Sequence, residues 1–379
     1  MLVAVFVAVL ALLSILLIVL PKKAGELSPL EFRVLADHPI KGKDAAKLAE
    51  ELANGRLSSN VDSFLEDHYP FRSFFIALDS YYTRLTGRNV DRSVIWGRND
   101  RLFDAPVDHD TEQLRSNIDA IMSFADANGL SAVIIDVPSS ATVDREDLPT
   151  LCKDYHDLDI IGEISASCSA YVPALVSQYI ADEHSDRIYY RTDHHWTMYG
   201  AYVCYCDVAR RLGVDPVPMS DFTVEGYDFF GSFYREAGLW LTKPDTLEIW
   251  RSPVLESALV TIGWGDRAKV YRGVYDPEKL KEDEVDKYAA YLYSNNGLTV
   301  IDNAAGNGKS LMIVKDSYGN SITPLFAMNY STIIMIDTRY YDTSLPKPSE
   351  LAALYGVKDI VVVMGTESMV SDCQLIFMR

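Results

Sequence analysis

Apolar runs alternate with amphipathic segments along much of the chain after residue 110. Residues 110–129, DTEQLRSNIDAIMSFADANG, place apolar side chains at helical spacing and end in a glycine. Continuous apolar runs typical of buried strands follow at 131–138 (SAVIIDVP), 310–316 (SLMIVKD), 332–337 (TIIMID) and 358–365 (KDIVVVMG). This alternation predicts an α/β domain with a doubly wound parallel sheet and helices on both faces.

The first twenty residues, MLVAVFVAVLALLSILLIVL, contain no charged side chain. Such a run, at about 1.5 Å per residue, matches the roughly 30 Å hydrocarbon core of a bilayer, so residues 1–21 are predicted to form a transmembrane helix. A cleaved signal segment and a buried soluble helix are the alternatives; signal regions are normally shorter and end in small residues. Lys22 and Lys23 follow the span, which by the positive-inside rule favours a cytoplasmic flank.

Three parts are predicted along the chain: the anchor or signal segment 1–21, a helical and hairpin region over 22–105, and the α/β domain over 106–379. In the second part, residues 64–87 carry apolar side chains at helical spacing, and 93–104 have the pattern of a strand, a turn and a return. Residues 215–300 are irregular, aromatic and acidic, and form a predicted insert in the α/β domain.

The composition restricts the classes of partner. The 35 basic and 54 acidic residues give a formal net charge of −19, which repels nucleic acid and anionic lipid headgroups, so no nucleic-acid partner is expected. Tyrosine is frequent, 23 of 379 residues, and surface tyrosines suit sugar-binding grooves because they offer a flat apolar face and a hydroxyl.

The cysteine pattern leaves the redox compartment open. The chain has five cysteines and no C-x-x-C pair: Cys152, Cys168, Cys204, Cys206 and Cys373. Cys152 and Cys168 bracket a short polar loop and could form a disulfide in an exported domain. Cys204 and Cys206 lie two apart in a predicted helix and are expected to be packed thiols.

The first candidate site is the segment 314–321, VKDSYGNS, where a strand ends and a helix begins. Ligands of doubly wound sheets bind at the carboxyl ends of the strands. There the hydroxyl of Ser317 faces unpaired helix amides, which favour a developing negative charge. Gly319 permits close approach, and Asn320 supplies a further amide donor. The alternative is that Ser317 is only an N-cap, a position that serine commonly fills.

The second candidate site is the segment 191–202, RTDHHWTMYGAY, which follows a short predicted strand at 186–190. In an extended segment, Asp193 and His195 point to the same side, so the carboxylate could orient the imidazole as a general base. His194 then points away. A structural reading remains, with histidine at a helix start packed by Trp196. A metal site is disfavoured because three consecutive side chains do not readily converge on one ion, and no metal or other cofactor is expected.

Several motifs together resemble a known family. TDHHW followed by GAY is similar to the signature of the DHHW proteins, which are related to the SGNH-hydrolase-like proteins of alginate O-acetylation. Further similar segments, in the family's order, are LEDHYPFRSFFIALDSYY, VIWGRNDRLFD, VIIDVPSSATV, FFGSFYREAG, VKDSYGNSITPLFA and IDTRYYD. The resemblance implies an SGNH-hydrolase-like fold with permuted motifs, in which Asp-x-His precedes the serine.

The resemblance also implies roles for individual residues. Ser317 is implied as the nucleophile, His195 as the general base and Asp193 as its orienting carboxylate. The implied oxyanion and substrate-binding residues are Asn320, Tyr318, Arg339 and Trp196.

Two details depart from this pattern or stand outside it. The lysine or similar residue usual after Pro138 is replaced by Ser139 and Ser140, so a substrate contact there is in doubt. Ser232 is a second conspicuous serine, but nothing in the sequence indicates a base for it, and a turn role is expected.

The function implied is an extracytoplasmic O-acyltransferase, in particular an O-acetyltransferase, or an acetylesterase acting on a cell-surface or secreted polysaccharide. The implied partners are a polysaccharide acceptor, a membrane-bound O-acyltransferase that supplies acyl groups, and the membrane itself through the N-terminal helix. The protein would be anchored on the extracytoplasmic face, or secreted if the segment is cleaved. The alternative is a non-catalytic glycan-binding or scaffold protein of a polysaccharide assembly complex, because a fold alone does not fix a function.

Overall fold

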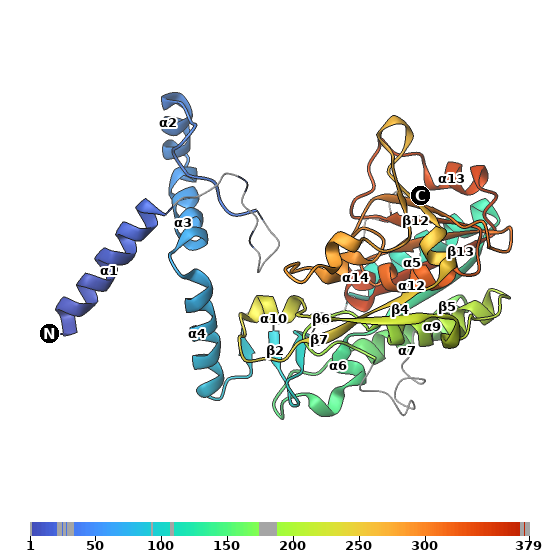
Figure 1. Cartoon of the computed structure of the whole chain (residues 1–379), viewed down its shortest axis with the longest axis horizontal. Coiled ribbons are helices and arrows are strands. Elements are labelled where there is room, and N and C mark those ends of the chain that lie inside the picture. The colour runs from blue at the N-terminus through green and yellow to red at the C-terminus, as the bar shows by residue number, and fades with distance from the viewer. Residues whose placement is uncertain are drawn as a thin grey trace. The chain divides into compact units, whose positions relative to one another are not determined.

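The computed structural model describes residues 2–20, 25, 28, 34–91, 94–106, 110–173, 188–371 and 375 (Figure 1). The chain forms two compact units. One comprises Met1–Val94 and Tyr234–Thr242, and the other comprises Ile95–Phe233 and Lys243–Arg379. Lys22, Lys23 and Cys373 lie outside the described residues.

The first unit is mainly helical. Its elements are α1 (Leu2–Val19), α2 (Ala45–Ala53), α3 (Arg56–His68), α4 (Arg72–Leu85) and the short strand β1 (Val90–Asp91). The side chain of Asp44 caps α2 by accepting a hydrogen bond from the Lys47 amide. In α4 the buried Ser80 donates its hydroxyl to the Ala237 carbonyl at 2.6 Å, which ties this helix to the second segment of the same unit.

The N-terminal apolar segment forms a helix, but it is shorter than the predicted anchor of residues 1–21, since α1 runs from Leu2 to Val19. Within the described part of the chain, no helix meets both the length and the apolarity needed to cross a membrane, so the predicted transmembrane helix is not supported.

An eight-stranded sheet forms the centre of the second unit. Its order is β5-β4-β13-β11-β12-β10-β8-β9. The strands are β4 (Ser131–Val137), β5 (Tyr171–Pro173), β8 (Leu259–Ile262), β9 (Lys269–Arg272), β10 (Leu298–Asp302), β11 (Ser310–Lys315), β12 (Thr332–Asp337) and β13 (Asp359–Gly365). The five strands from β5 to β12 in this order are parallel, whereas β10, β8 and β9 continue the sheet in antiparallel pairing.

The predicted parallel sheet is therefore confirmed for five strands, whereas the three strands at one side are antiparallel. The predicted insert supplies β8, β9 and the start of β10, which the sequence showed only as short apolar runs. Antiparallel neighbours need only a short connection, here residues 263–268 between β8 and β9, so no crossover helix was present to reveal them.

The strand register brings the ends of four parallel strands together. Lys315 of β11 pairs with Asp337 of β12 and with Val363 of β13, and Gly365 of β13 pairs with Val137 of β4. The loops that follow β4, β11, β12 and β13 therefore emerge at one edge of the sheet, where ligands bind in doubly wound folds.

Helices cover both faces of the sheet, as predicted. Leu311 and Ile313 of β11 face a core shared with α9 (Met198–Arg211) and α12 (Gly319–Ala327). Met312 and Val314 of the same strand face the opposite core, which is shared with α5 (Thr111–Asn128), α7 (Asp157–Ser167), α13 (Pro348–Leu354) and α14 (Thr366–Val370). Successive side chains of a buried strand thus enter two different cores, which explains the continuous apolar sequence.

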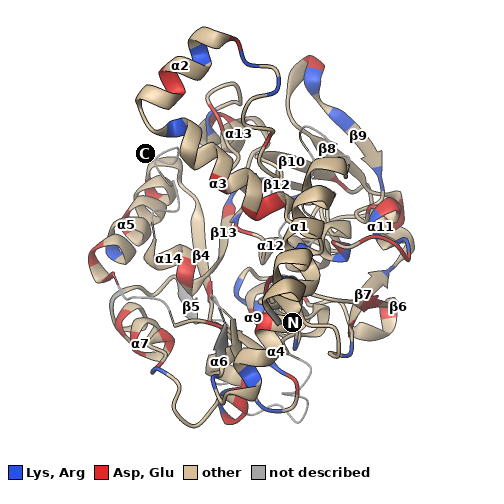
Figure 2. Ribbon diagram, turned by 90° about the vertical axis from the view of Figure 1, so that its left-hand side faces the viewer, with Lys and Arg blue, Asp and Glu red and all other residues tan. Residues whose placement is uncertain are grey.

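Shorter elements complete the chain. These are β2 (Val94–Trp96), β3 (Leu102–Asp104), α6 (Ser140–Val143), α10 (Ser232–Ala237), α11 (Pro253–Ser257), and the antiparallel ribbon of β6 (Thr223–Phe229) and β7 (Asp245–Arg251). Single turns of 3-10 helix lie at Arg145–Asp147, Met219–Asp221, Gly265–Arg267, Pro277–Leu280 and Lys287–Ala290. Acidic residues occur along many elements, including α5, α7 and α11 (Figure 2).

Candidate active site

A cavity of about 180 Å³ lies at the carboxyl ends of the parallel strands. Residues that follow four different strands line it: Val137 and Ser139 at β4, Asp316, Ser317 and Tyr318 after β11, Arg339 after β12, and Gly365 and Thr366 at β13. His194 and Asp157 contribute from other segments. The cavity thus occupies the position that the sheet topology favours for a ligand.

The loop with the two histidines is closed at its base by backbone pairing. Tyr189 forms an isolated bridge with Trp196, and the Thr197 amide donates to the Ile188 carbonyl at 2.8 Å. A strand was predicted at 186–190. Within the described residues 188–190, the structure has this isolated bridge in place of a strand. Thr197 then caps α9, since its side chain accepts from the Gly200 amide, so the loop passes directly into a helix.

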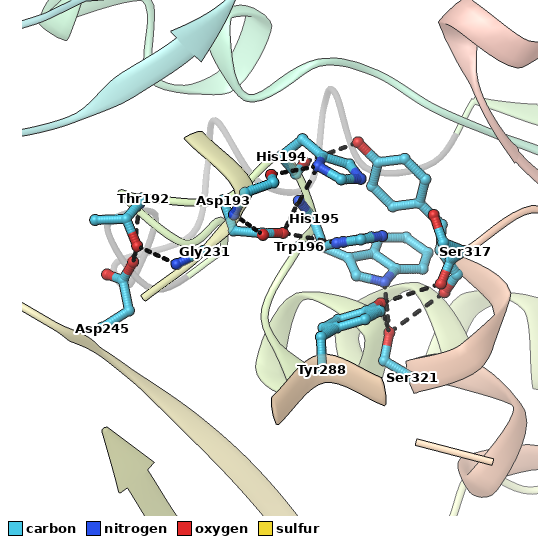
Figure 3. Close-up of polar contacts among 12 residues, drawn as sticks. Thr192, Asp193, His194, His195, Trp196, Gly231, Asp245, Tyr288, Ser317 and Ser321 are labelled. Atoms are coloured by element: carbon cyan, nitrogen blue, oxygen red, sulfur yellow. Dashed lines mark hydrogen bonds and ion pairs between the residues drawn. The ribbon is translucent and has the colours of Figure 1, made fainter. Parts of the chain in front are cut away.

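Asp193 and His195 form the predicted pair. His195 Nδ1 lies 2.6 Å from Asp193 Oδ1, and the same oxygen accepts the His195 amide at 2.9 Å (Figure 3). A carboxylate accepts hydrogen bonds, so Nδ1 carries the proton, and Nε2 of the neutral ring presents a lone pair. This is the tautomer that a general base needs.

The second oxygen of Asp193 is also used. Oδ2 accepts the Ser232 amide at 2.7 Å. Burial alone would raise the pKa of Asp193, but His194 and His195, including the hydrogen bonds from His195, hold that pKa well below its ordinary value. The carboxylate is therefore ionised at neutral pH and suited to stabilise an imidazolium beside it.

A second buried carboxylate supports the loop from outside. Asp245 Oδ2 accepts the Thr192 amide at 2.8 Å and the Thr192 hydroxyl at 2.6 Å, and Thr192 Oγ1 in turn accepts the Gly231 amide at 3.0 Å (Figure 3). Position 231 requires glycine, because a Cβ there would lie 2.2 Å from Asp193 Cβ. These contacts fix the backbone that carries the Asp–His pair.

His195 is packed between aromatic rings. Its imidazole stacks on Tyr288 with ring centroids 3.8 Å apart and an interplanar angle of 11°, and the ring of Tyr318 lies at 5.1 Å, edge-on. Within the described residues, His195 Nε2 is buried and has no hydrogen-bond partner. A buried acceptor without a partner is costly, so this nitrogen is a candidate to accept a hydrogen bond from a bound group.

The loop of Ser317 is held mainly by the residue before it. Asp316 Oδ1 accepts the Tyr318 amide at 3.0 Å, and Oδ2 accepts the Gly365 amide and the Ser368 hydroxyl, both at 2.8 Å. The N-cap of α12 is Tyr318 and no side-chain cap bond forms there. The alternative in which Ser317 acts as an N-cap is therefore wrong, and its hydroxyl is available for chemistry.

The amides of this loop are almost all engaged. Those of Asp316, Tyr318, Gly319 and Asn320 donate within the loop or to the sheet. Among the described residues, the Ser317 amide is not one of these donors, so it remains for an oxyanion formed at the Ser317 hydroxyl.

Tyr288 connects the two halves of the site. Its hydroxyl lies 3.2 Å from the Ser317 carbonyl oxygen and 3.2 Å from Ser321 Oγ, while its ring stacks on His195 (Figure 3). Trp196 Nε1 also donates to Ser321 Oγ, at 2.8 Å. Among the described residues, however, no hydrogen bond joins Ser317 Oγ to His195 Nε2, so of the predicted triad the structure shows the Asp193–His195 contact alone.

The other predicted site residues divide into two groups. Tyr318 and Arg339 line the cavity, and the Tyr318 hydroxyl donates to the His194 carbonyl at 2.8 Å. Asn320 and Trp196 are buried and do not line the cavity. The side-chain amide of Asn320 donates to Asn295 Oδ1 at 2.9 Å, and Trp196 lies in the core.

Arg339 is fixed by a buried ion network. Its guanidinium donates twice to Asp337, from Nε at 2.9 Å and from a terminal nitrogen at 2.7 Å. Asp337 also accepts from the fully buried Lys315 at 2.9 Å. Burial lowers the pKa of Lys315, whereas for Asp337 the hydrogen bonds and charges of Arg339 and Lys315 outweigh burial and lower the pKa. A bidentate pair of this kind holds the cation in a defined orientation at the cavity.

Sequence reasoning missed several residues of the site. Tyr288 comes from the insert, where no motif distinguishes it from the many other tyrosines. His194, which was predicted to point away from the Asp–His pair, lines the cavity, and its Nδ1 lies 2.8 Å from Ser232 Oγ. Burial and the adjacent His195 lower the pKa of His194 to about 4, so it is neutral at pH 7. The FFGSFY motif at 229–234 drew attention to Ser232 in the sequence. The sequence could not show that Ser232 contacts His194, because the two residues are 38 positions apart.

At the cavity wall after β4, Asp157 of α7 holds Ser139 and Thr142 through hydrogen bonds. Its Oδ2 accepts the Ser139 amide at 2.7 Å, the Ser139 hydroxyl at 2.6 Å and the Thr142 hydroxyl at 3.0 Å. This wall therefore presents a satisfied carboxylate, not a cation.

A metal site was disfavoured because three consecutive side chains do not readily converge on one ion, but here their ligating atoms do come close together. One ligating atom from each of Asp193, His194 and His195 lies within 4.8 Å of the other two. Each imidazole already has a hydrogen-bond partner, His195 on Asp193 and His194 on Ser232, so the clustering follows from the hydrogen bonds of the Asp–His pair. Cys152 and Cys168 are free thiols, so the disulfide considered from the sequence is not formed.

Comparisons with known families agree with this site. The family model of DHHW proteins matches residues 168–336, which contain both candidate loops. The model of the SGNH hydrolase-like domain of the acetyltransferase AlgX matches residues 94–225. The resemblance to the DHHW protein family is confirmed.

Solved structures of similar fold include a DHHW family protein from Eubacterium siraeum, with a TM-score of 0.60 and 21% sequence identity, over 76% of this chain and 98% of that one. Bacillus cereus PatB1 is similar with a TM-score of 0.62 and 17% identity, over 74% and 98% of the two chains. A second PatB1 structure, with a sulfonyl adduct, gives a TM-score of 0.61. At these identities the likeness shows the fold alone. No curated protein matches the chain.

Proposed function

We propose that this protein is an extracytoplasmic O-acyltransferase that transfers a short acyl group, acetyl, to a hydroxyl of a polysaccharide, and that releases the acyl group to water when no acceptor is bound. The state of His195 carries the proposal. Asp193 holds His195 in the tautomer of a general base, and the Nε2 atom of His195 is buried beside the loop of Ser317, without a hydrogen-bond partner among the described residues.

The chemistry follows from this arrangement. Ser317 Oγ attacks the acyl carbonyl while His195 Nε2 takes its proton, and Asp193 stabilises the imidazolium that forms. The Ser317 amide donates to the oxyanion. His195 then returns the proton to the leaving group, and an acceptor hydroxyl attacks the acyl-serine with His195 again as base.

The size of the cavity supports a short acyl group. Its volume of about 180 Å³ is below the roughly 300–1,000 Å³ of pockets that hold drug-sized ligands. The match to an acetyltransferase domain model over residues 94–225 supports acetyl in particular.

The location and partners rest on the family resemblance. By that resemblance the protein acts outside the cytoplasm on a cell-surface or secreted polysaccharide, and a membrane-bound O-acyltransferase supplies the acyl group.

The test uses the full-length protein with p-nitrophenyl acetate. Release of p-nitrophenol and the intact mass of the protein are measured for wild type, Ser317→Ala and His195→Ala, with the exposed Ser220→Ala as a matched control. We expect an acetyl adduct on Ser317 in wild type and Ser220→Ala, and loss of turnover by at least about 10³-fold in the other two variants. An adduct that persists in Ser317→Ala would reject the assignment.

A non-catalytic glycan-binding role is the second candidate. The observation in its favour is that no hydrogen bond joins Ser317 Oγ to His195 Nε2 within the described residues. Under this function a phenylmethylsulfonyl fluoride probe leaves Ser317 unmodified, whereas the proposed enzyme forms a sulfonyl–Ser317 adduct. The structure of Bacillus cereus PatB1 with a sulfonyl adduct is the precedent for such a group on a protein of similar fold. Oligosaccharide binding without either adduct would favour the scaffold.

A further inference from the structure

The two histidines of the loop differ in what they face. The side chain of His195 is 7% exposed and its ring is covered by Tyr288, whereas the side chain of His194 is 33% exposed. His194 lines the cavity together with Ser317, and His195 does not. The proposed general base is therefore the covered histidine, and the histidine exposed to the cavity is its neighbour His194.

Both histidines are oriented by the same carboxylate. Asp193 Oδ1 binds Nδ1 of His195 directly. Asp193 Oδ2 binds the amide of Ser232, and Ser232 Oγ lies 2.8 Å from Nδ1 of His194. Nδ1 is engaged in each imidazole, which leaves Nε2 of each ring for chemistry or binding.

The backbone also fixes His194. Its carbonyl accepts the Tyr318 hydroxyl at 2.8 Å, and its ring meets the rings of Tyr318 and Phe233 edge-on, both at 6.1 Å between centroids. Tyr318 follows Ser317 in the chain, so the nucleophile loop and this histidine are connected directly.

We propose that His194 binds the hydroxyl group of the acyl acceptor through Nε2, and that Ser232 is the positioning residue that holds its ring. This inference rests on the proposed function. A neutral imidazole suits a hydroxyl, since either tautomer offers one partner for it. The depressed pKa of His194, about 4, agrees with a neutral ring. The ligand class is a polyol or sugar.

The transfer step balances with His195 as the base. The acceptor oxygen forms a bond to the acyl carbon, and the bond from that carbon to Ser317 Oγ breaks. The acceptor proton passes to His195 Nε2 and from there to Ser317 Oγ. His194 exchanges no proton. It orients the acceptor so that the acceptor's hydroxyl oxygen attacks the acyl carbon faster than water does.

Two substitutions at one position separate this role from a structural one. Asparagine places an amide near Nδ1 and keeps a partner for Ser232, whereas glutamine places an amide near Nε2 and keeps a group toward the cavity. An acceptor-binding role requires His194→Asn to be the more damaging change. A role confined to the contact with Ser232 requires the opposite order.

The experiment follows the acyl-enzyme of the full-length protein. The burst of p-nitrophenol from p-nitrophenyl acetate reports acylation of Ser317, and mass spectrometry of the products reports partition between water and two added acceptors, glycerol and cellotetraose. In His194→Asn we expect the acceptor concentration for half-maximal transfer to rise about tenfold, with acylation reduced less than threefold. His194→Gln recovers part of the loss, and Ser232→Ala gives an intermediate value. His156→Asn, at an exposed histidine, is the control.

Each outcome decides. Equal losses of acylation and transfer in His194→Asn, or a larger transfer loss in His194→Gln, would overturn the acceptor role while leaving Ser317 as nucleophile. If wild type forms no acetyl–Ser317, the proposed function fails and the acceptor role fails with it. Wild-type acylation with hydrolysis only, unchanged by either acceptor, would overturn the acceptor role alone.

Discussion

At the scale of single residues, the Asp193 carboxylate is the group on which most of the site depends. Its Oδ1 accepts hydrogen bonds from the side chain and the backbone amide of His195, and its Oδ2 accepts one from the backbone amide of Ser232. Replacing Asp193 by asparagine changes which nitrogen of His195 carries the proton but hardly changes the shape of the side chain. The contribution of the Asp193–His195 hydrogen bond can therefore be tested by itself.

We expect Asp193→Asn to lower kcat for p-nitrophenyl acetate by about 10³–10⁴-fold. The asparagine amide donates to His195 Nδ1, so the proton moves to Nε2 and the ring no longer accepts a proton from Ser317. Steady-state kinetics with circular dichroism, to establish that the variant is folded, measure this. A loss below tenfold in a folded variant would show that His195 does not act as the base.

His194 makes stability depend on pH. Its pKa is about 4 in the folded protein and about 6.5 in an unfolded chain, so between these values the unfolded state binds more protons. Stability is then lost as pH falls from about 6.5 to about 4. The side chain is one-third exposed, and solvent screening reduces the effect, which we expect to be about 1–2 kcal/mol.

Urea unfolding of wild type and His194→Gln at pH 7.0 and pH 4.5 measures this contribution. The decrease in unfolding free energy between the two pH values should be about 1–2 kcal/mol smaller in the variant, because glutamine does not titrate. An identical decrease in both proteins would show that His194 is not held neutral by the fold.

At the scale of elements, the 3-10 turn Lys287–Ala290 delivers Tyr288 to the centre of the site. The next residues, Leu292, Tyr293 and Ser294, all have positive φ, which is unfavourable for each of them. Asn295 follows and accepts from both Lys315 and Asn320. The insert therefore reaches Lys315 at the end of β11 through a strained turn that these hydrogen bonds hold in place.

Tyr288→Phe and Tyr288→Leu separate the two contacts of this element. Phenylalanine keeps the stack on His195 and loses the hydroxyl bonds, so we expect about a threefold to tenfold loss of kcat and about 1 kcal/mol of stability. Leucine also loses the stack and should reduce kcat further and change the pH profile of kcat, with KM little altered. Tyr271→Phe, at a tyrosine stacked on Tyr293, is the matched control. Equal kinetics for wild type and the leucine variant would exclude a role for Tyr288.

Gly231 approaches the histidine loop so closely that position 231 has no room for a side chain. A Cβ there would meet Asp193 Cβ at 2.2 Å and the Thr192 carbonyl at 2.4 Å, so Gly231→Ala should displace the Asp193 loop, at about 1–3 kcal/mol of stability and with a large loss of kcat. Gly162→Ala in α7 is the control, since nothing lies within 4 Å of its Cβ position and alanine favours helix. Thermal unfolding and ester hydrolysis of both variants measure the difference, and unchanged activity in Gly231→Ala would contradict the tight approach.

At the scale of the whole molecule, the parallel strands, the helices on both faces and the Asp193–His195 pair could be predicted because their signals are local. Strand β11 is a continuous apolar run, and two residues of an extended segment reach one side. The contacts of Tyr288 with the site and the contact of Ser232 with His194 could not be predicted. They join residues that are 29 or more positions apart, and no periodic pattern in the sequence indicates them. The antiparallel β8 and β9 were missed because short strands without helices resemble an irregular insert.

Net charge belongs to the whole molecule, and it makes a prediction about acceptors. The formal charge of −19 at pH 7 should repel a polyanionic glycan at low ionic strength, while a neutral glycan is unaffected. Salt shortens the Debye length from about 30 Å at 0.01 M to about 8 Å at 0.15 M, so it removes most of this repulsion. Transfer of acetyl to oligogalacturonate should therefore rise by several-fold between these salt concentrations, whereas transfer to cellotetraose should stay constant. The partition of acetyl–Ser317 between water and each acceptor measures both. A faster reaction with the anionic acceptor at low salt, lost in Arg339→Gln, would show instead that the local cation at the cavity outweighs the charge of the whole chain.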